Sequence, residues 1–261
     1  MERDTGRNRS ASLRRALAML DTLADAGGGL TLAELAASAQ VDKSTASRLL
    51  APLREFGLAE TDDAGRVRLG VRLVQLGQVY LDRLDLRTAA LPVLRELTAQ
   101  VGETSHLVLY QHPDVVYVEK VEADSAVQMR SRVGRVEPAA STGVGRAILA
   151  HVSPDLLDDI VGRGLVKRTP ATTTSTRRWR AELATARERG YALDDCENEA
   201  EIRCVGSAIF DHRGEVAAAL SVAGPAWRLT LERAHELGPA VAAAAAAVSG
   251  RLGAPQREAT A

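Results

Sequence analysis

The segment from residue 31 to residue 70 narrows the possible folds of this chain more than any other part of it. Thr31, followed three residues later by Glu34, has the pattern of a capping box and predicts a helix from Leu32 to Ala39. Asp42 is a suitable N-cap for a second, longer helix, and a small hairpin is expected to follow that helix. A short helix, a tight turn, a longer helix and a hairpin are the order of elements that places one helix in the major groove of DNA.

The two faces of the longer helix differ in a way that favours binding to nucleic acid. Its apolar residues recur at the spacing of one buried helix face and are Ala46, Leu49, Leu50 and Leu53. Its opposite face carries two cations, three hydroxyls and no acid, and consists of Lys43, Ser44, Thr45, Ser47 and Arg48. Such groups suit phosphate oxygens and base edges, and Arg48 is suited to a bidentate contact with guanine. The alternative is an ordinary solvated helix face, which the preceding helix and turn disfavour.

The elements around these two helices support the same interpretation. Two short strands are expected at Leu58–Glu60 and Arg66–Leu69, joined by a turn at residues 62–65. They predict a wing in which Arg66 and Arg68 contact the DNA backbone or the minor groove. An earlier helix is expected at Ser12–Ala26, where Leu13, Leu17, Leu20 and Leu23 recur at helical spacing. The turn between the two later helices holds Ala39 and Gln40, where glycine is frequent, so the helix-turn-helix assignment depends on the whole unit.

The charge of the chain does not by itself indicate a nucleic-acid partner. The 261 residues carry a formal net charge of −1, and residues 1–70 contain ten Lys and Arg against ten Asp and Glu. Positive charge must therefore be placed locally, and the first fifteen residues, which hold five arginines, do this. We expect residues 1–10 to form a flexible basic arm. A disordered, solvated tail without a DNA contact is the alternative.

Composition limits the remaining classes of protein. Two cysteines are too few for a disulfide framework, and the first residues lack the apolar core of a secretory signal. The longest apolar run, Ala240–Val248, falls short of the ~20 residues needed to cross a bilayer. We therefore expect a cytoplasmic protein with no membrane partner, and a flexible tail at residues 254–261.

A helix at Val71–Leu84 is expected to connect two domains. It is apolar on two sides, which indicates a connector that also packs against a second subunit, although a purely intramolecular role remains open. The expected organisation is a winged helix-turn-helix domain at residues 11–70, a linker and dimerisation helix at 71–88, and a second domain at 89–253.

The second domain alternates pairs of strands with pairs of helices and lacks the repetition of a βαβ fold. Strands are expected at His106–Tyr110, Val115–Val121, Val127–Val133, Cys204–Phe210 and Val216–Val222. Helices are expected at Leu91–Val101, Gly145–Val152, Pro154–Val161, from residue 177 to about Arg189, and Thr230–Leu252. This order predicts an antiparallel sheet flanked by helices, so the whole chain is of the α+β class.

Five short motifs follow one another in this domain: Ser141–Ala147 (STGVGRA), Gly190–Asp195 (GYALDD), Ile202–Val205 (IRCV), Ile209–Asp211 (IFD) and Ala219–Pro225 (ALSVAGP). Each is weak alone. In this order behind a winged unit, they resemble the effector-binding domain of the IclR-type transcriptional regulators, and the resemblance covers about residues 10–253. It implies a GAF-like effector domain and a repressor of a catabolic operon. The expected partners are an inverted-repeat operator of double-stranded DNA, a small organic acid or aromatic metabolite, and a second copy of the chain in a homodimer or dimer of dimers.

The resemblance also implies where the effector binds. The positions that match the family's pocket are Met129, Gly143, Val144, Asp194, Cys204, Ser221 and Ala223. Locally, Ser141 and Thr142 cap a helix whose first amides, at Gly143 to Gly145, predict a carboxylate site. The chain departs from the family at three positions, with Arg146 in place of the usual lysine, Cys196 within an acidic run, and Ala223 where some members carry serine. The last change predicts an effector less polar than the smallest keto acids.

Two other classes of function remain as alternatives. One is a DNA-binding regulator that has lost its response to small molecules. The other is an enzyme in which Cys204, Asp194 and a histidine form a nucleophile and base. The five histidines are scattered and lie in no nucleophile signature, and no CxxC or HxxxH motif predicts a metal site, so we expect no catalytic residue, metal or cofactor.

Overall fold

The computed structural model describes residues 4–82, 85–124 and 130–255. The chain divides into two compact units, Met1–Arg83 and Leu84–Ala261, and each is considered by itself below. The division falls inside the expected linker at residues 71–88. Two helices are present there, where a single helix was expected to run to Leu84.

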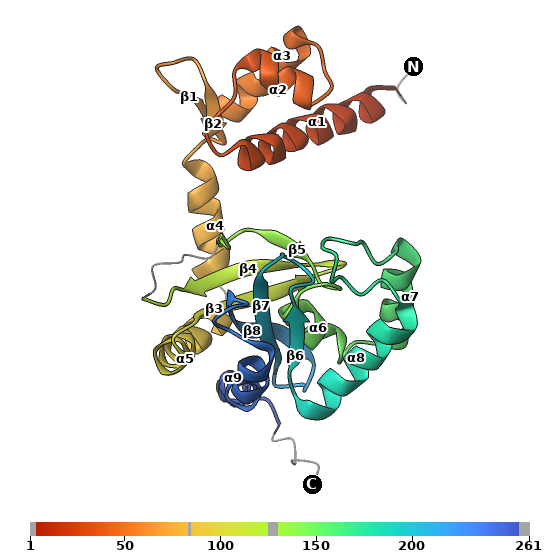
Figure 1. The fold of residues 1–261 in the computed structure, drawn as a ribbon. Helices are drawn as coiled ribbons and strands as arrows, with labels where there is room; N and C mark the ends of the chain where they lie inside the picture. Colours follow the sequence, from red (N-terminus) through yellow and green to blue (C-terminus); the bar gives the residue numbers. More distant parts are fainter. Residues whose placement is uncertain (1–3, 83–84, 125–129, 256–261) are drawn as a thin grey trace. The chain divides into compact units, whose positions relative to one another are not determined.

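The first unit is a winged helix-turn-helix (Figure 1). Its elements are α1 (Asp4–Ala26), α2 (Leu32–Ser38), α3 (Lys43–Glu55), β1 (Ala59–Thr61), β2 (Val67–Leu69) and α4 (Arg72–Asp82). The strands of the wing pair antiparallel, and Leu30 adds a bridge to Val67 on the other side of β2. The capping box is present: the Thr31 hydroxyl accepts a hydrogen bond from the Glu34 amide, and the Glu34 carboxylate accepts one from the Thr31 amide.

Helix α1 differs from its prediction in both extent and orientation. It begins at Asp4, so residues 4–10, expected to belong to a flexible arm, are helical. Its buried residues are Ala16, Met19 and Leu23, which pack with α2, α3 and the wing. Leu13 and Leu17 are 62% and 51% exposed, so the leucine spacing alone did not identify the buried face.

The turn between α2 and α3 takes the conformation that glycine would favour, although it holds none. Gln40 has φ of 54°, in the left-handed region. The amide of Val41 donates to the carbonyl of Ala36 at 3.0 Å, which closes the turn. Gln40 therefore supplies the reversal that a glycine commonly provides in helix-turn-helix units.

The second unit is built on one six-stranded antiparallel sheet, in the order β5-β4-β3-β8-β7-β6. Its strands are β3 (Thr104–Gln111), β4 (Asp114–Val121), β5 (Val136–Pro138), β6 (Ala192–Asp195), β7 (Ile202–Phe210) and β8 (Val216–Pro225). Its helices are α5 (Asp85–Val101), α6 (Gly143–Leu149), α7 (Pro154–Arg163), α8 (Thr176–Arg189) and α9 (Leu231–Arg251). The expected α+β class and antiparallel sheet are confirmed.

Helices cover both faces of this sheet (Figure 1). On one face Ser105 of β3 donates to the carbonyl of Leu94 in α5 at 3.1 Å, and the amide of Phe210 in β7 donates to Ser249 of α9 at 3.0 Å. Helix α6 lies on the other face and is flanked by α8. Register and alternation place one set of residues on the α6 face: His106, Asp194, Cys204, Gly206, Ser221 and Ala223.

Two strand predictions need correction. Residues 130–133 are not in a strand, and β5 lies at Val136–Pro138 instead; residues 127–129 of the expected strand lie outside the described residues. Strand β6 was missed because it is only four residues long and follows the αL cap at Gly190 directly. No helix among the described residues is long and apolar enough to cross a membrane.

Candidate functional site

The outer face of α3 forms the first candidate site. Asp42 accepts hydrogen bonds from the Ser44 hydroxyl at 2.5 Å and from the Thr45 hydroxyl at 2.6 Å, and these bonds lower its pKa below the usual range. Those two hydroxyl protons are therefore engaged in capping the helix. Lys43, Ser44, Ser47 and Arg48 are exposed and Thr45 is half-buried, so the predicted face is turned to solvent. Arg48 contacts the Thr45 hydroxyl at 3.4 Å, one turn earlier on the helix.

The two wing arginines make contacts within the protein. Arg66 donates to the carbonyl of Gly29 at 2.9 Å and ties the wing to the loop after α1. Arg68 forms an ion pair with Asp62 at 2.7 Å across the hairpin. Both residues are exposed, but any contact with DNA must share or replace these partners.

The second candidate site is a small cavity on the α6 face of the sheet, with a volume of about 30 Å³. This is room for about one water molecule. Three of the sequence-predicted residues line it: Asp194, Cys204 and Ala223. Ser221 lies behind this wall and hydrogen-bonds the Cys204 thiol. Met129 lies outside the described residues.

One of the amides at the start of α6 is occupied by the helix cap. The amide of Gly145 donates to the Thr142 hydroxyl at 3.1 Å. The amides of Gly143 and Val144 face the sulfur of Cys204 and oppose the rise in its pKa. The Gly145 amide therefore has a partner within the chain, and the binding of a carboxylate at Gly143 to Gly145 stays a prediction.

The glycines around α6 allow its backbone to approach the sheet. A Cβ on Gly206 would lie 2.6 Å from the carbonyl carbon of Gly143, and one on Gly145 would lie 2.2 Å from the carbonyl oxygen of Ala139. Neither distance can be accommodated without moving backbone. These glycines therefore serve close packing.

Asp194 is a buried carboxyl group that organises the loop after β6. Its Oδ1 accepts from the amides of Glu197 at 2.7 Å and Asn198 at 3.2 Å. Burial raises its pKa to about 7, and the two amides and the cation of Arg146 only partly oppose that rise. Cys204, paired with Asp194 in the sheet, has its pKa raised to about 12 by burial. A thiol in that state is a poor nucleophile, which argues against the cysteine-enzyme alternative.

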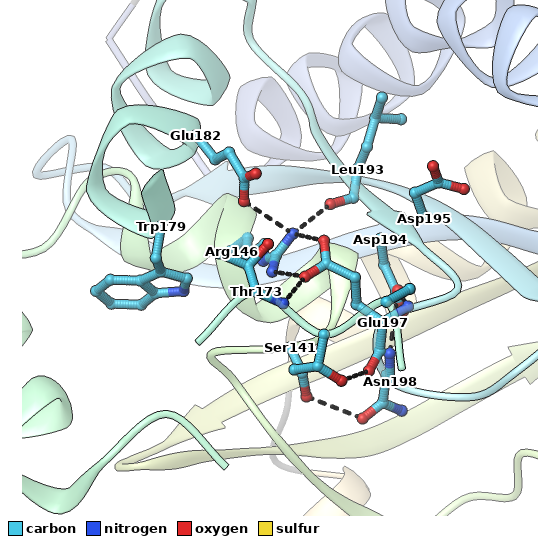
Figure 2. Close-up of polar contacts among 12 residues, drawn as sticks. Ser141, Arg146, Thr173, Trp179, Glu182, Leu193, Asp194, Asp195, Glu197 and Asn198 are labelled. Atoms are coloured by element: carbon cyan, nitrogen blue, oxygen red, sulfur yellow. Dashed lines mark hydrogen bonds and ion pairs between the residues drawn. The ribbon is translucent and has the colours of Figure 1, made fainter. Parts of the chain in front are cut away.

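Arg146, which replaces the family's usual lysine, lies in a buried ion pair beside this loop. Its guanidinium donates to both carboxylate oxygens of Glu197, at 2.5 and 2.7 Å, and to the carbonyls of Ala140 and Leu193 (Figure 2). Glu197 also accepts from the Thr173 amide at 2.6 Å. Arg146 is fully engaged in holding α6 against the loop, so it has a structural role. Removing one partner of such a pair typically costs about 3–5 kcal/mol.

Sequence reasoning missed several residues that line the same cavity: His106, Tyr117, Ser131, Thr142, Arg135, Asn198, Glu199 and Ile202. A signal was available for His106, because it is polar, lies in the middle of a strand with apolar neighbours, and is expected to be buried there. No comparable signal marked Arg135, which lies in the connection before β5. Among the described residues, no group of three or more His, Cys, Asp or Glu is placed to hold a metal ion.

Two family models together match most of the chain. The IclR helix-turn-helix domain matches residues 12–63, and the C-terminal domain of the bacterial transcriptional regulator IclR matches residues 78–250. The chain is 33% identical to the acetate operon repressor of Salmonella typhimurium over 242 residues, which covers 91% of this chain and 88% of that relative.

Solved structures agree with this similarity. The structure of the Thermotoga maritima IclR is 33% identical, with a TM-score of 0.75, over 94% of this chain and 99% of that one. An IclR homologue from Microbacterium hydrocarbonoxydans, in complex with 4-hydroxybenzoate, is 27% identical, with a TM-score of 0.81, over 92% and 98% of the two chains.

A winged helix-turn-helix unit followed by an α+β domain with its own cavity is the architecture of a DNA-binding transcriptional regulator. The matches extend through both units. The chain belongs to the IclR family of transcriptional regulators.

The buried carboxyl of Asp194 predicts a pH dependence of stability. Its pKa in the folded protein is about 7 and its ordinary value is 3.8, so its ionisation opposes folding as the pH rises between these values. Relative to Asp194→Asn, the wild type should lose about 2 kcal/mol of unfolding free energy between pH 5 and pH 8. Asparagine keeps the carbonyl oxygen that accepts from the loop amides. Chemical denaturation at several pH values measures the difference, and parallel pH profiles for the two proteins would contradict this assignment.

Proposed function

We propose that this regulator represses a catabolic operon and is released from its operator by a small organic acid. The single observation that carries the proposal is the combination of an exposed cationic face on α3 with a separate buried polar cavity in the second unit. Relatives that cover nine-tenths of the chain support the sign of regulation, because they are named as repressors.

DNA recognition is assigned to α3. Lys43, Ser47 and Arg48 lie on its exposed face, while Ala46 and Leu50 are buried on the other side. Lys43 and Ser47 lie about one helical turn apart. A cation and a hydroxyl at this spacing suit contacts with phosphates and base edges in a major groove. Ser44 and Thr45 are assigned to the start of the helix, where their oxygens remain able to accept. Arg66 and Arg68 are assigned to the wing contact.

Replacing Arg48 by alanine should weaken binding to the cognate operator by ~1–3 kcal/mol and relax base preference at one position. Arg54→Ala is the matched control, because Arg54 is also exposed on α3 but lies about a third of a turn away from Arg48 around the helix. The Arg54→Ala control should lower the affinity for DNA only slightly, and by the same factor for cognate and scrambled sequences. Gel-shift titrations on cognate and scrambled DNA measure both effects. Unchanged affinity and preference in Arg48→Ala would remove α3 as the recognition helix.

The operator is proposed to be an inverted repeat bound by a homodimer or a dimer of dimers. One recognition helix reads only a few base pairs, so a long site requires two copies. Helix α4 and the residue before it expose Val71, Val74, Leu76 and Val79, each at about half or more of its accessible surface. An apolar face of this kind, on a unit that binds DNA, supports a second copy as its partner.

Substitution of Leu76 by aspartate should convert dimers to monomers and abolish operator binding, because a charge would be buried in the subunit contact. Leu76 is 47% exposed in the single chain. Val166→Asp is the control, since Val166 is 68% exposed in the second unit and is not assigned to the contact. Light scattering after size-exclusion chromatography gives the mass. A dimer of normal affinity in the Leu76 variant would exclude α4 from the interface.

The effector is proposed to bind at the cavity lined by Asp194, Cys204 and Ala223, with Ser221 and the Gly143–Val144 backbone behind it and Met129 assigned to the same site. Among the residues that line the cavity, the cation available to a carboxylate is Arg135. Arg135 donates to Glu199 at 2.6 Å and pairs with Glu137, and Glu199 is the more exposed of these two acids. The Microbacterium homologue, described as a complex with 4-hydroxybenzoate, supports an organic acid as the ligand. A coupling of ~1–3 kcal/mol between effector and operator is typical of such regulators.

Arg135→Gln should reduce affinity for the acid by about 10–100-fold and leave operator binding without effector unchanged, because a charge-assisted hydrogen bond is lost. The probes are acetate, pyruvate, benzoate and 4-hydroxybenzoate, tested by calorimetry and by release of operator DNA. Arg180→Gln is the control, because Arg180 also pairs with an acid, Asp158, but lies on α8 away from the cavity. Equal acid affinity in Arg135→Gln and wild type would place the carboxylate elsewhere.

A regulator that has lost its response to small molecules is the second candidate. The small volume of the cavity favours it, because 30 Å³ does not hold an organic acid without rearrangement. The same titrations decide between the two, since a protein without sensing would bind operator equally at every concentration of every acid.

A further inference from the structure

His106 is a buried polar group that the assignments above do not use. It lies on β3, is 2% exposed and lines the cavity beside Asp194 and Cys204. Its ring packs edge-to-face against Tyr117, with 5.2 Å between ring centroids. The contact fixes the ring plane, so the two nitrogens have defined positions.

Among the described residues, only one of those nitrogens has a hydrogen-bond partner. Nε2 lies 2.7 Å from the hydroxyl oxygen of Ser131. Nδ1 is buried and has no hydrogen-bond partner among the described residues. Leaving a buried polar atom unpaired costs about 1–3 kcal/mol, so such an atom on a residue that lines a cavity favours a ligand group that completes it.

The chemistry of that group follows from the state of the ring. Burial, together with the nearby cation of Lys120, lowers the pKa of His106 to about 3, so the imidazole is neutral. A neutral imidazole presents Nδ1 either as an acceptor or as a donor, depending on which nitrogen carries the proton. A hydroxyl group satisfies either form because it both donates and accepts.

A larger cleft borders the cavity and can hold the body of a ligand. This cleft has a volume of about 350 Å³ and shares Arg135, Asn198 and Glu199 with the cavity. Arg130 and Arg168 add two further cations to its lining. The space therefore suits an anion outside and one small polar group inside, where about one water molecule fits.

We propose that His106 determines effector specificity and that the effector is a hydroxylated organic acid. Its hydroxyl group enters the cavity and hydrogen-bonds Nδ1 of His106, while its carboxylate remains in the cleft at Arg135. This proposal rests on the proposed function, in that it names the chemical class of acid sensed by the same site. Acids that lack the hydroxyl leave Nδ1 unpaired and bind more weakly.

Calorimetry with matched pairs of acids tests the proposal on the full chain. The pairs are glycolate and acetate, malate and succinate, and 4-hydroxybenzoate and benzoate, each differing by one hydroxyl. The measured quantity is the ratio of affinities within a pair. Wild type should prefer the hydroxylated member of at least one pair by about tenfold or more, the value expected for one completed buried hydrogen bond.

Three variants separate the hydrogen bond from the packing of the ring. His106→Phe keeps a ring against Tyr117 and removes both nitrogens, and His106→Gln keeps a polar group on the Nε2 side towards Ser131. Both substitutions should bring the ratio of affinities within a pair close to one, without lowering the affinity for the acid that lacks the hydroxyl. His106→Asn keeps a polar group on the Nδ1 side and should retain the preference. His235→Phe is the control, because His235 also packs edge-to-face on a tyrosine but lies outside the cavity.

The outcomes distinguish this proposal from the proposed function. If acids bind and the ratio is the same in wild type, His106→Phe and His106→Gln, the role of His106 is overturned while acid sensing stands. If wild type shows no preference within any pair, the hydroxylated class is overturned in the same way. If no acid of the panel binds wild type, acid sensing fails and this inference fails with it.

Discussion

The close approach of helix α6 to strand β7 determines the geometry of the second unit. The approach requires glycine at position 206, where a Cβ would meet backbone atoms of Gly143 and Val144 within 3 Å, and Gly145 allows the same helix to approach the backbone of Ala139. It brings the amides of Gly143 and Val144 to the sulfur of Cys204. The cavity is what remains between the strands and the loops around this contact, which explains both its small volume and its polar lining.

The buried ion pair between Arg146 of α6 and Glu197 holds the loop that follows β6 against this helix. Glu197 is joined to the 165–173 connection through the Thr173 amide, and Asn198 next to it accepts from Ser141 at 3.0 Å (Figure 2). A displacement of this loop would therefore move both α6 and the residues at the cavity mouth. Desolvation of the two charges is costly, but their hydrogen bonds are nearly complete, so the pair acts mainly to select one arrangement of the loop.

The sequence predicted elements whose signals are local. Capping at Thr31 and Asp42, the αL termination at Gly190 and the two long hairpins depend on neighbouring residues and were predicted near their observed bounds. Features that depend on distant partners were not. The buried face of α1 was misjudged because Met19 and Ala16 meet α2 and α3, and the nearness of Cys204 to the α6 amides was not predicted because Cys204 reaches them from another strand. Met129 lies outside the described residues, and the roles of the other six predicted pocket positions remain predictions.

The order of strands has a consequence for how the protein is made. The centre of the sheet pairs β3 with β8, two strands more than a hundred residues apart in the chain. Loop closure of this length is slow, and the sheet cannot close until β8 has been synthesised. The winged unit, by contrast, is complete in the first third of the chain, and its most distant strand pairing is the bridge between Leu30 and Val67. On the ribosome, the winged unit is therefore able to fold well before the second unit has been synthesised.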